Sequence, residues 1–596
     1  MNLTPEEREV GKDNYHEAVG SLDSRRDFLK KGIASGLVSG AGLGAMVFDY
    51  GSARSLSSPL RVGVIGTGDE GSVLIGAINP DYVQVVAIAD IRPYNVHRAF
   101  HGDWYSDGAL TARPGLMKKY GWKTEDEARK KVAVYVDRYE DLLDNPDVEA
   151  VIIALPLHLH DTAAIKAMRK GKHVLTEKLM AHSVHQCKEM ARVAQQTKML
   201  LATGHQRHYS VLYDNALDII KQGILGDLHF IRAQWHRGNL PGRDSWQPPL
   251  PEAEGYTLRD FELGLREIRK LRDKPLEREY VATHGLMAKL RSFRGKLKDP
   301  RAKDIDLWQK RVKQVEMQLA DFAVVAENYG YEEKTLQDGQ GTQRTALEEL
   351  LRWRLWNRTG GGLMAELGSH QLDAAGLFIQ ADWNNGRKPH PLSVVGVGGR
   401  HIFPADRDAN DHVYCTFEYP GKGYYKDAQM TEVADPNKKI VVTYSSINGN
   451  GWGGHGETVY GTQGTMMLEK EKEVLLFKNS STSRVVIKKQ GGGPTLDTTE
   501  SGPSAAASLS KAASDGPISR GYTEEIEHWA WCIRNPDPEN VPRCHPQVAL
   551  ADAVIALTSN IAIESKQRIE FRREWFDIDS DETPEEVKPR VAKDIS

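Results

Sequence analysis

A glycine-rich turn directly after an apolar segment constrains this chain of 596 residues more than any other feature. Residues 60–65 (LRVGVI) have the composition of a buried strand, and Gly66-Thr67-Gly68-Asp69-Glu70-Gly71 follows at once, before a predicted helix over 72–78. Gly66 permits a tight turn, Gly68 lets a pyrophosphate approach the backbone, and Gly71 lets helix and strand pack closely. The free N–H groups at the helix start favour an anion there. The segment therefore predicts a dinucleotide site.

The end of the next predicted strand indicates which dinucleotide binds. Residues 83–89 are apolar and lead to Asp90, which lies 19 residues after Gly71. A carboxylate at this place accepts hydrogen bonds from the ribose hydroxyls and repels a 2′-phosphate. We therefore expect NAD rather than NADP. Arg92 lies close by and leaves NADP as the less favoured alternative, because an arginine can accommodate the phosphate.

Strand and helix patterns alternate over the following hundred residues. Apolar strands separated by helices predict an α/β class with a doubly wound parallel sheet. Ligands in such sheets bind outside the carboxyl ends of the strands, where Pro156, Glu177, Lys178 and His205 fall. The predicted strands are 148–155, 173–175 and 199–203, and the predicted helices are 139–143, 162–170 and 183–196.

Four ordered blocks resemble the Gfo/Idh/MocA oxidoreductases, whose members mostly act on sugars and polyols with NAD(P). The blocks are the glycine loop with Asp90, ALPLHLH (154–160), TEKL (176–179) and GGLMAELGSHQLD (361–373). The chain departs from the family pattern twice, since Leu179 stands in place of a proline and Glu366 in place of an aspartate. The resemblance implies a second α+β domain with an open mixed sheet.

The resemblance also implies roles for particular residues. Lys178 and His370, with Glu366, are the expected catalytic groups; Lys178 takes up or orients the hydroxyl proton, and His370 is the second candidate acid–base. The expected substrate contacts are Lys178, Tyr209, Trp235, Arg237, Trp246 and His370, although the Trp235–Trp246 stretch could equally be an ordinary loop. The expected cofactor contacts are Gly66, Thr67, Gly68, Glu70, Gly71, Asp90, Arg92, Leu155, Pro156, His158, His160, Glu177, Lys178, Gln206 and Arg207.

The N-terminal region has a different character. Arg25 and Arg26 precede an apolar stretch from Gly32 to Phe48 that is too short to span a bilayer comfortably. This layout resembles a bacterial twin-arginine signal, and it implies export to the periplasm by the machinery that exports folded proteins. The alternative is a basic amphipathic or disordered tail. No stable membrane span is expected after processing.

The remaining chain divides by composition. We expect a signal and linker over 1–57, a Rossmann domain over 58–205 and a substrate domain over 206–575. A charged helical insertion occupies 251–358, where Trp308, Val312, Val315, Leu319 and Phe322 form an apolar stripe. A Gly/Ser/Ala-rich stretch over 490–515 predicts a flexible loop, and 576–596 predicts a solvated acidic tail.

Composition excludes several classes of partner and site. The net charge of −4 gives no reason to expect nucleic acid. None of the four cysteines stands at C-x-x-C spacing, although Cys532 and Cys544 could pair in an oxidising compartment. His158 and His160 without a third nearby ligand do not predict a metal. A homo-oligomer is expected.

We therefore predict an exported NAD-dependent oxidoreductase that acts on a hydroxyl of a sugar, glycoside or polyol. One alternative is a glycosidase that oxidises a ring hydroxyl transiently, eliminates the aglycone, adds water and returns the hydride. Both suit a compartment without free NAD, because each can recycle a bound cofactor. A second alternative is a non-catalytic sugar-binding protein on a retained dinucleotide fold, since Leu179 and Glu366 depart from the family pattern.

Overall fold

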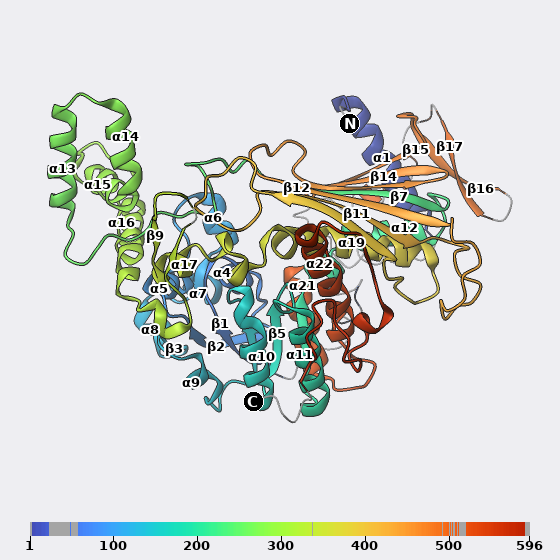
Figure 1. Ribbon diagram of the computed structural model, residues 1–596, viewed down its shortest axis with the longest axis horizontal. Helices are drawn as coiled ribbons and strands as arrows, with labels where there is room; N and C mark the ends of the chain where they lie inside the picture. The colour runs from blue at the N-terminus through green and yellow to red at the C-terminus, as the bar shows by residue number, and fades with distance from the viewer. Residues whose placement is uncertain are drawn as a thin grey trace.

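The computed structural model describes residues 3–22, 48, 50, 58–336, 338–490, 493–499, 501, 504, 507, 508, 510, 511 and 520–590. Two sheets form the body, and a helical arm extends from the first of them (Figure 1). The Arg25-Arg26 pair and most of the apolar stretch after it lie outside the described residues.

The first sheet is parallel, as predicted. Its six strands, counted over the described residues, run in the order β3-β2-β1-β4-β5-β6. Alternate residues of each strand enter different apolar clusters, so Val151 and Ile153 face one layer of helices while Ala150 and Ile152 face the other. The strands are β1 (Leu60–Ile65), β2 (Val83–Ala89), β3 (Ala133–Tyr135), β4 (Ala150–Ile153), β5 (His173–Glu177) and β6 (Leu201–Gly204). The helices of this domain are α4 (Asp69–Ala77), α5 (Pro93–His101), α6 (Asp107–Ala112), α7 (Gly115–Tyr120), α8 (Glu125–Arg129), α9 (Tyr139–Leu143), α10 (His160–Arg169) and α11 (Val184–Thr197).

The second sheet is mixed and open, which confirms the predicted class. Over the described residues its order is β15-β14-β13-β7-β12-β11-β10-β18, with β7 parallel to β12 and antiparallel to β13. Helices cover one face, while Val395, Val397 and Tyr414 are exposed on the other. The strands are β7 (Leu228–His236), β10 (Ser393–Gly399), β11 (His412–Pro420), β12 (Lys439–Ile447), β13 (His455–Gly461), β14 (Gly464–Glu469), β15 (Glu473–Lys478) and β18 (Ile569–Glu570). The covering helices are α12 (Val211–Lys221), α19 (Ser369–Trp383) and α22 (Pro546–Ser565).

The insertion is helical, as expected, and lies against the first domain rather than the second (Figure 1). Val312 and Val315 of the predicted stripe are buried in its own small core with Phe261, whereas Phe322 is exposed. Its longer helices are α13 (Leu258–Lys270), α14 (Lys274–Thr283), α15 (Gly285–Lys298) and α16 (Ile305–Ala320). Short elements lead back to the second domain: η3 (Asp321–Ala323), η4 (Ala326–Tyr329), β8 (Lys334–Thr335), β9 (Gln343–Arg344), α17 (Ala346–Leu351), η5 (Trp353–Leu355), α18 (Asn357–Gly360) and a π-helical turn, η6 (Met364–Gly368).

Two predictions for the C-terminal part need correction. The first residues of the predicted flexible loop over 490–515 belong to a hairpin of β16 (Val485–Gln490) and β17 (Gly493–Thr498), since the alternating residues before and after the glycines pair as strands, and most of the predicted loop after Thr499 lies outside the described residues. The predicted solvated tail keeps its acidic side chains mostly exposed, but its backbone is anchored. The buried Lys188 ammonium donates to the carbonyl oxygens of Glu574, Ser580 and Glu582, and Ile578 is buried.

The chain returns to the first domain near its end. Helix α21 (Tyr522–Arg534) places Ile526, Trp529 and Ala530 in the apolar cluster of the first sheet, and η7 (Arg573–Phe576) follows α22. In the described residues one helix, α22, is long and apolar enough to cross a membrane, and 72% of its most apolar stretch is buried inside the protein. Its burial accounts for its composition, because it is a central helix of the core.

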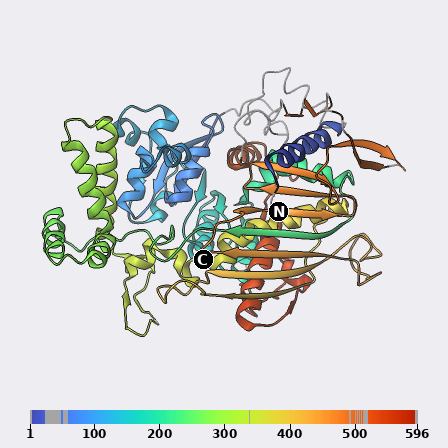
Figure 2. The same cartoon turned by 90° about the horizontal axis from the view of Figure 1, so that it is seen from above.

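The residues before the twin-arginine pair are not a plain linker. Helix α1 (Pro5–Ser21) begins with a capping box between Thr4 and Glu7 and lies beside the second sheet (Figure 2). Asn14 is fully buried, donates to the carbonyl oxygens of Leu476 and Ser483, and accepts from the N–H of Val485. This part of the predicted signal and linker is therefore packed on the body. The four cysteines are buried and free, so Cys532 and Cys544 do not pair.

Candidate functional site

One large cavity joins the first domain, the second sheet and the insertion. Its volume is about 1330 Å³, beyond the roughly 300–1,000 Å³ usual for small-molecule pockets. The glycine loop lines one part of it, and the carboxyl ends of β4 and β5 line the middle. Strand β7 and the segment after it line the other part. The cavity is therefore large enough for an extended ligand together with a second molecule.

The glycine loop fits a dinucleotide pyrophosphate. A Cβ on Gly71 would lie 2.0 Å from the carbonyl oxygen of Gly66, so only glycine allows this close turn. By contrast, a Cβ on Gly68 would meet no atom nearer than 3.8 Å, because this residue borders the cavity. Gly68 precedes α4 without a side-chain cap, so the first N–H groups of the helix remain available to an anion.

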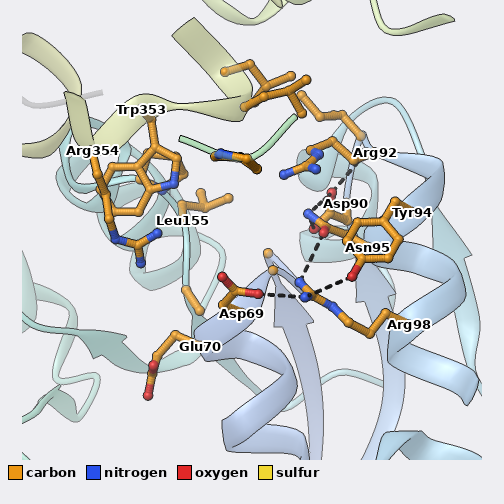
Figure 3. Close-up of a pocket in the computed structure, with 18 of the residues that line it drawn as sticks. Asp69, Glu70, Asp90, Arg92, Tyr94, Asn95, Arg98, Leu155, Trp353 and Arg354 are labelled. Carbon is orange, nitrogen blue, oxygen red and sulfur yellow. Dashed lines mark hydrogen bonds and ion pairs between the residues drawn. The ribbon is translucent and has the colours of Figure 1, made fainter. Parts of the chain in front are cut away.

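Asp90 is held at the ribose end of this loop. Its Oδ2 accepts from the N–H of Thr67 at 2.7 Å, and its Oδ1 accepts from the N–H of Arg92 at 2.9 Å. Asn95 donates to the same carboxylate, and Arg98 in turn donates to Asn95 and to Asp69 (Figure 3). The network fixes the carboxylate at the cavity wall, where a ribose diol would meet it.

The predicted Arg92 side chain has an unexpected partner. Its Nε and one Nη lie 2.9 Å and 2.8 Å from Oδ2 of Asp321, which comes from the insertion. Asp321 is 1% exposed, and its Oδ1 accepts from the N–H of Tyr94. The guanidinium that a 2′-phosphate would need is therefore already paired.

The middle of the cavity contains the predicted Glu177 and Lys178 at the end of β5, with Leu155 and Pro156 after β4. The Nζ of Lys178 donates to the backbone carbonyl oxygen of Glu366 at 2.7 Å, which joins the two domains across the cavity. The Lys178–Leu179 peptide bond is cis. Burial, with the neighbouring Glu70, raises the pKa of Glu177 well above its ordinary value.

Glu366 forms an ion pair with Arg354, a residue that the sequence did not single out. The Nε of Arg354 lies 2.9 Å from Oε2 of Glu366. Burial alone would raise the pKa of Glu366, but the charges of Arg354 and Lys178 hold it below the ordinary value, so the carboxylate stays ionised. Arg354 lies across the cavity from Asp69 and Glu70, next to Trp353 (Figure 3).

His370 begins the long helix α19 after the π-helical turn that carries Glu366. Both side chains line the cavity, as the four-residue spacing predicts. Burial, together with the positive charge of Lys178, keeps the pKa of His370 well below its ordinary value. Its Nδ1 is buried without a hydrogen-bond partner among the described residues. The imidazole is therefore neutral at neutral pH and can accept a proton.

Trp235 and Trp246, two of the expected substrate contacts, form an aromatic wall of the cavity. Trp235 lies 5.5 Å from the His370 ring, measured between centroids. The Arg237 guanidinium lies 5.6 Å from the ring centroid of Trp235 and 5.7 Å from that of Trp246. It forms no ion pair with a carboxylate in the part of the chain that the structure describes. Flat aromatic faces with a polar donor between them suit a polyhydroxylated ring.

Several predicted contacts do not line the cavity. Arg207 is buried, pairs with Glu457 and Glu471, and donates to the carbonyl oxygen of His370, so it supports the site from behind. The hydroxyl of Tyr209 interacts with His528 and the N–H of Arg543, because η2 (Gln206–Tyr209) turns this side chain into the core. The structure thus corrects two predictions, Arg207 as a cofactor contact and Tyr209 as a substrate contact.

The two predicted histidines after β4 are also structural. Both ring nitrogens of His160 lie within hydrogen-bond distance of carbonyl oxygens, those of Leu155 and Leu179, so the ring connects the ends of β4 and β5. His158 packs edge-on against Tyr331, and burial lowers its pKa to about 4. Thr67 and Gly71 act through the loop rather than at the cavity surface. The remaining predicted residues line the cavity: Gly66, Gly68, Glu70, Asp90, Arg92, Leu155, Pro156, Glu177, Lys178, Gln206, Trp235, Arg237, Trp246, Glu366 and His370.

The residues that sequence reasoning missed come from the insertion and its return segment. Arg354 lies in RWRLWNR (352–358), a mixture of arginine and tryptophan like the one recognised at Trp235–Trp246. This mixture of arginine and tryptophan is a signal that could have identified Arg354. Nothing in the sequence around Asp321 distinguishes it from the other acidic residues of the insertion. The Rossmann ribose site and Asp321 are brought together only by the fold.

Buried histidine and carboxylate clusters also lie behind the site. His208, Asp373 and Asp552 are close enough to ligate an ion. The Lys388 ammonium, however, already lies 2.7 Å from Asp552 and 3.2 Å from Asp373, so a cation balances these carboxylates. The expectation of no bound metal stays a prediction.

Comparison with known proteins agrees with this geometry. The family model described as "Oxidoreductase family, NAD-binding Rossmann fold" (GFO_IDH_MocA) matches residues 60–205. A "Glycosyl hydrolase family 109 protein" of Solibacter usitatus (strain Ellin6076) is 27% identical over 218 residues, which are 34% of this chain and 44% of that protein. The 1,5-anhydro-D-fructose reductase of Ensifer adhaerens is 29% identical over 195 residues, 32% of this chain and 56% of that protein.

The chain thus spans about half the length of these curated relatives. A crystal structure of an NAD binding oxidoreductase from Klebsiella pneumoniae is 14% identical, with a TM-score of 0.48 over 87% of this chain and 100% of that one. The glycine loop, the fixed carboxylate of Asp90 and the match over residues 60–205 identify this region as the Rossmann domain of the Gfo/Idh/MocA oxidoreductase family, with NAD as its cofactor.

Proposed function

We propose that this protein is an exported NAD-dependent oxidoreductase that acts on a hydroxyl of a sugar, glycoside or polyol. One observation carries the proposal: Lys178, His370 and the Glu366–Arg354 pair line the same cavity as the dinucleotide loop. The aromatic wall of Trp235 and Trp246 adds a surface suited to a sugar ring. The names of the relatives, a sugar-derivative reductase among them, are consistent with this class.

The residues of the chain supply binding and proton transfer. The glycine loop and Asp90 would hold NAD, which would supply the acceptor for the hydride of the carbinol carbon. The neutral His370 accepts the hydroxyl proton, since its depressed pKa leaves a free lone pair at neutral pH. The Nζ of Lys178 orients the hydroxyl oxygen and stabilises its developing negative charge. The ionised Glu366 holds Arg354 beside the substrate space.

A Lys178→Met variant tests the proposal. Purified protein is incubated with a panel of sugars, glycosides and polyols, and reduction of the bound dinucleotide is measured together with oxidised sugar. We expect Lys178→Met to retain its dinucleotide but to lose about 10²-fold or more of the sugar-dependent reduction. The control is Lys170→Met, which removes an exposed ion pair with Asp144. Unimpaired turnover in Lys178→Met would refute the assigned role.

A glycosidase that uses transient oxidation is the second candidate, because two matching relatives are named glycosyl hydrolase family 109 proteins. The same residues would serve it, since it also begins with removal of a ring hydrogen. The assay separates the two reactions. Free sugar that accumulates over many turnovers, with no net reduction of NAD, identifies the glycosidase. Sugar binding with neither reduction of the dinucleotide nor release of free sugar identifies a non-catalytic binding protein.

Export and self-association are parts of the same proposal. Export rests on the sequence from Ser24 to Lys30, which resembles a twin-arginine signal. Replacing Arg25 and Arg26 by lysine should keep the protein in the cytoplasmic fraction, and normal export of that variant would argue against the pathway. A homo-oligomer remains our expectation, and the uncovered face of the second sheet, with Val395 and Val397 exposed, is available for it.

A further inference from the structure

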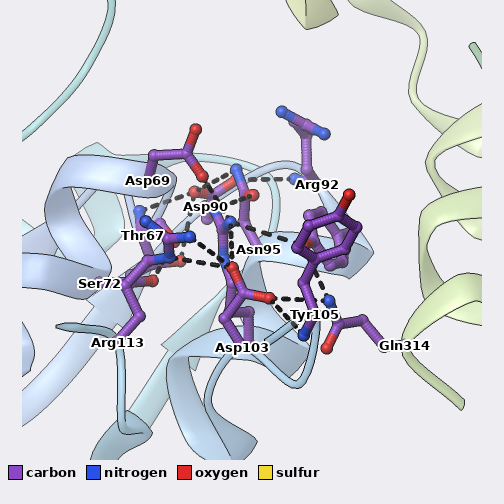
Figure 4. Close-up of polar contacts among 12 residues, drawn as sticks. Thr67, Asp69, Ser72, Asp90, Arg92, Asn95, Asp103, Tyr105, Arg113 and Gln314 are labelled. Atoms are coloured by element: carbon purple, nitrogen blue, oxygen red, sulfur yellow. Dashed lines mark hydrogen bonds and ion pairs between the residues drawn. The ribbon is translucent and has the colours of Figure 1, made fainter. Parts of the chain in front are cut away.

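The insertion forms a wall of the dinucleotide site. The side chain of Gln314 on α16 accepts from the N–H of Trp104 at 2.7 Å and donates to Asp103 at 3.0 Å. Arg311 on the same helix donates to the carbonyl oxygen of Trp104. These contacts hold α16 against the segment after α5, on the ribose side of the glycine loop, and Figure 4 shows Gln314 close to Asp103 and Tyr105. Residues of α15, α16 and η3 line the cavity: Lys289, Phe293, Arg311, Gln314, Val315, Gln318 and Asp321.

Asp321, at the end of this wall, pairs with Arg92, whose position bears on the choice between NAD and NADP. Arg92 stands two residues after Asp90, at the place where a guanidinium can bind a 2′-phosphate. The Nε–H of Arg92 instead donates to Oδ2 of Asp321 at 2.9 Å, one Nη lies 2.8 Å from the same oxygen, and Oδ1 of Asp321 accepts from the N–H of Tyr94. A charge-assisted hydrogen bond of this kind is stronger than one between neutral groups. A phosphate would have to displace it.

The charge of the site gives a second reason to expect NAD rather than NADP. Asp321 pairs with the Arg92 guanidinium, whereas Asp90 accepts from the backbone N–H groups of Thr67 and Arg92 and from the Asn95 amide, so this end of the site holds two carboxylates and one guanidinium. A 2′-phosphate would therefore enter a region whose fixed charge is negative rather than positive. A 2′-hydroxyl carries no charge and can donate to Asp90. The arrangement therefore favours the unphosphorylated ribose.

We propose that the helical insertion completes the ribose end of the dinucleotide site, and that Asp321 selects NAD over NADP by pairing with Arg92. Asp321 acts through Arg92 and is therefore a positioning residue. The proposal rests on the assignment of the dinucleotide site and not on the sugar reaction, so its test requires no substrate.

The test is a competition measured by dinucleotide identity. Protein is incubated with equimolar NAD⁺ and NADP⁺, separated from free dinucleotide, denatured, and the released molecules are quantified. We expect Asp321→Asn to raise the NADP⁺-to-NAD⁺ ratio about tenfold or more, because the amide keeps the shape but frees the guanidinium. Asp306→Asn is the matched control, since Asp306 is exposed at the start of α16. An unchanged ratio in Asp321→Asn would overturn the proposal.

A second variant keeps the test decisive if Asp321→Asn folds poorly. In Arg92→Gln the wild-type Asp321 remains, and the proposal expects no more than a small loss of NADP⁺ relative to NAD⁺, because the paired guanidinium contributes little to phosphate binding. A tenfold or larger loss would show that Arg92 already binds the 2′-phosphate and would refute the role of Asp321. In the double variant Asp321→Asn/Arg92→Gln, the NADP⁺-to-NAD⁺ ratio should lose the increase that Asp321→Asn alone produces.

Discussion

At the scale of single residues, the site is controlled by which side chains carry charge. Glu366 is ionised because Arg354 and Lys178 outweigh its burial. His370 is neutral because its burial and Lys178 act in the same direction. A neutral imidazole keeps one ring nitrogen with a free lone pair, which can accept the proton of a hydroxyl. A neighbouring charge also controls Arg92, because its guanidinium forms an ion pair with Asp321.

The protonation of His370 gives a testable pH dependence. A histidine of ordinary pKa, near 6.5, would lose half of its basic form at that pH. Since the pKa of His370 lies well below its ordinary value, we expect the acid limb of kcat against pH to lie below that ordinary value. His370→Asn should lower kcat by roughly 10²- to 10⁴-fold with its dinucleotide retained.

The control is His229→Asn, on an exposed position of β7, which should leave both kcat and its pH profile unchanged. An acid limb centred at pH 6.5 or above in the wild type would contradict the neutral, buried base.

The contribution of His370 to the pH dependence of stability has a defined sign. Because the folded pKa is lower than the unfolded one, acidification through pH 6.5 favours protonation of the unfolded chain and weakens folding.

At the scale of elements, the sequence predicted the first domain closely. Its strands are continuous apolar runs bounded by glycine and polar residues, so periodicity and turn signals agree, and β2 and α9 have the predicted bounds. The same approach placed Lys178, Glu366 and His370 in one cavity through the family motifs. Arg207 and Tyr209 were misplaced because a motif gives a position along the chain but not the direction of a side chain after the turn of η2.

Elements held by distant partners were less predictable. The segment after Asp577 has a solvated composition, yet Lys188 and Arg192 of α11 bind its carbonyl oxygens. The β16–β17 hairpin stands in a glycine-rich stretch where local preference favours a loop. Helix α1 is mostly polar, and its attachment depends on Asn14 reaching backbone groups 462 to 471 residues away. No local pattern contains such partners.

The attachment of α1 can be tested at Asn14. Asn14→Ala would leave the buried N–H of Val485 without its acceptor and would remove two donated hydrogen bonds, so we expect a loss of about 1–3 kcal/mol in the attachment of this helix. Limited proteolysis of the full chain should then cleave within residues 3–22 faster. Glu9→Ala is the control, because the Glu9 side chain is 61% exposed. Equal cleavage rates in the two variants would contradict the attachment.

At the scale of the whole molecule, the cavity is assembled from segments far apart in sequence. The first domain supplies the dinucleotide loop, β7 and η6 of the second domain supply the aromatic wall and Glu366, and the insertion returns to cover the ribose end. The C-terminal part then closes the structure. Arg534 of α21 pairs with Glu149 beside β4, and Asn79 donates to Glu527. The site therefore exists only when both domains are folded together.

Trp529 tests this dependence, because it places the C-terminal helix α21 in the core of the first domain. The side chain is fully buried in the cluster that contains Val64 and Ile152. We expect Trp529→Ala to reduce the free energy of unfolding by about 3–5 kcal/mol, since it removes a large side chain from a closely packed core. Urea denaturation followed by fluorescence and by release of dinucleotide should give one shared transition at a lower midpoint, because α21 links the two domains.

Trp452→Ala is the control, since Trp452 is 79% exposed and its replacement should leave the midpoint unchanged. Two separate transitions, with dinucleotide released in only the first, would instead mean that the Rossmann domain folds and binds independently of the C-terminal part.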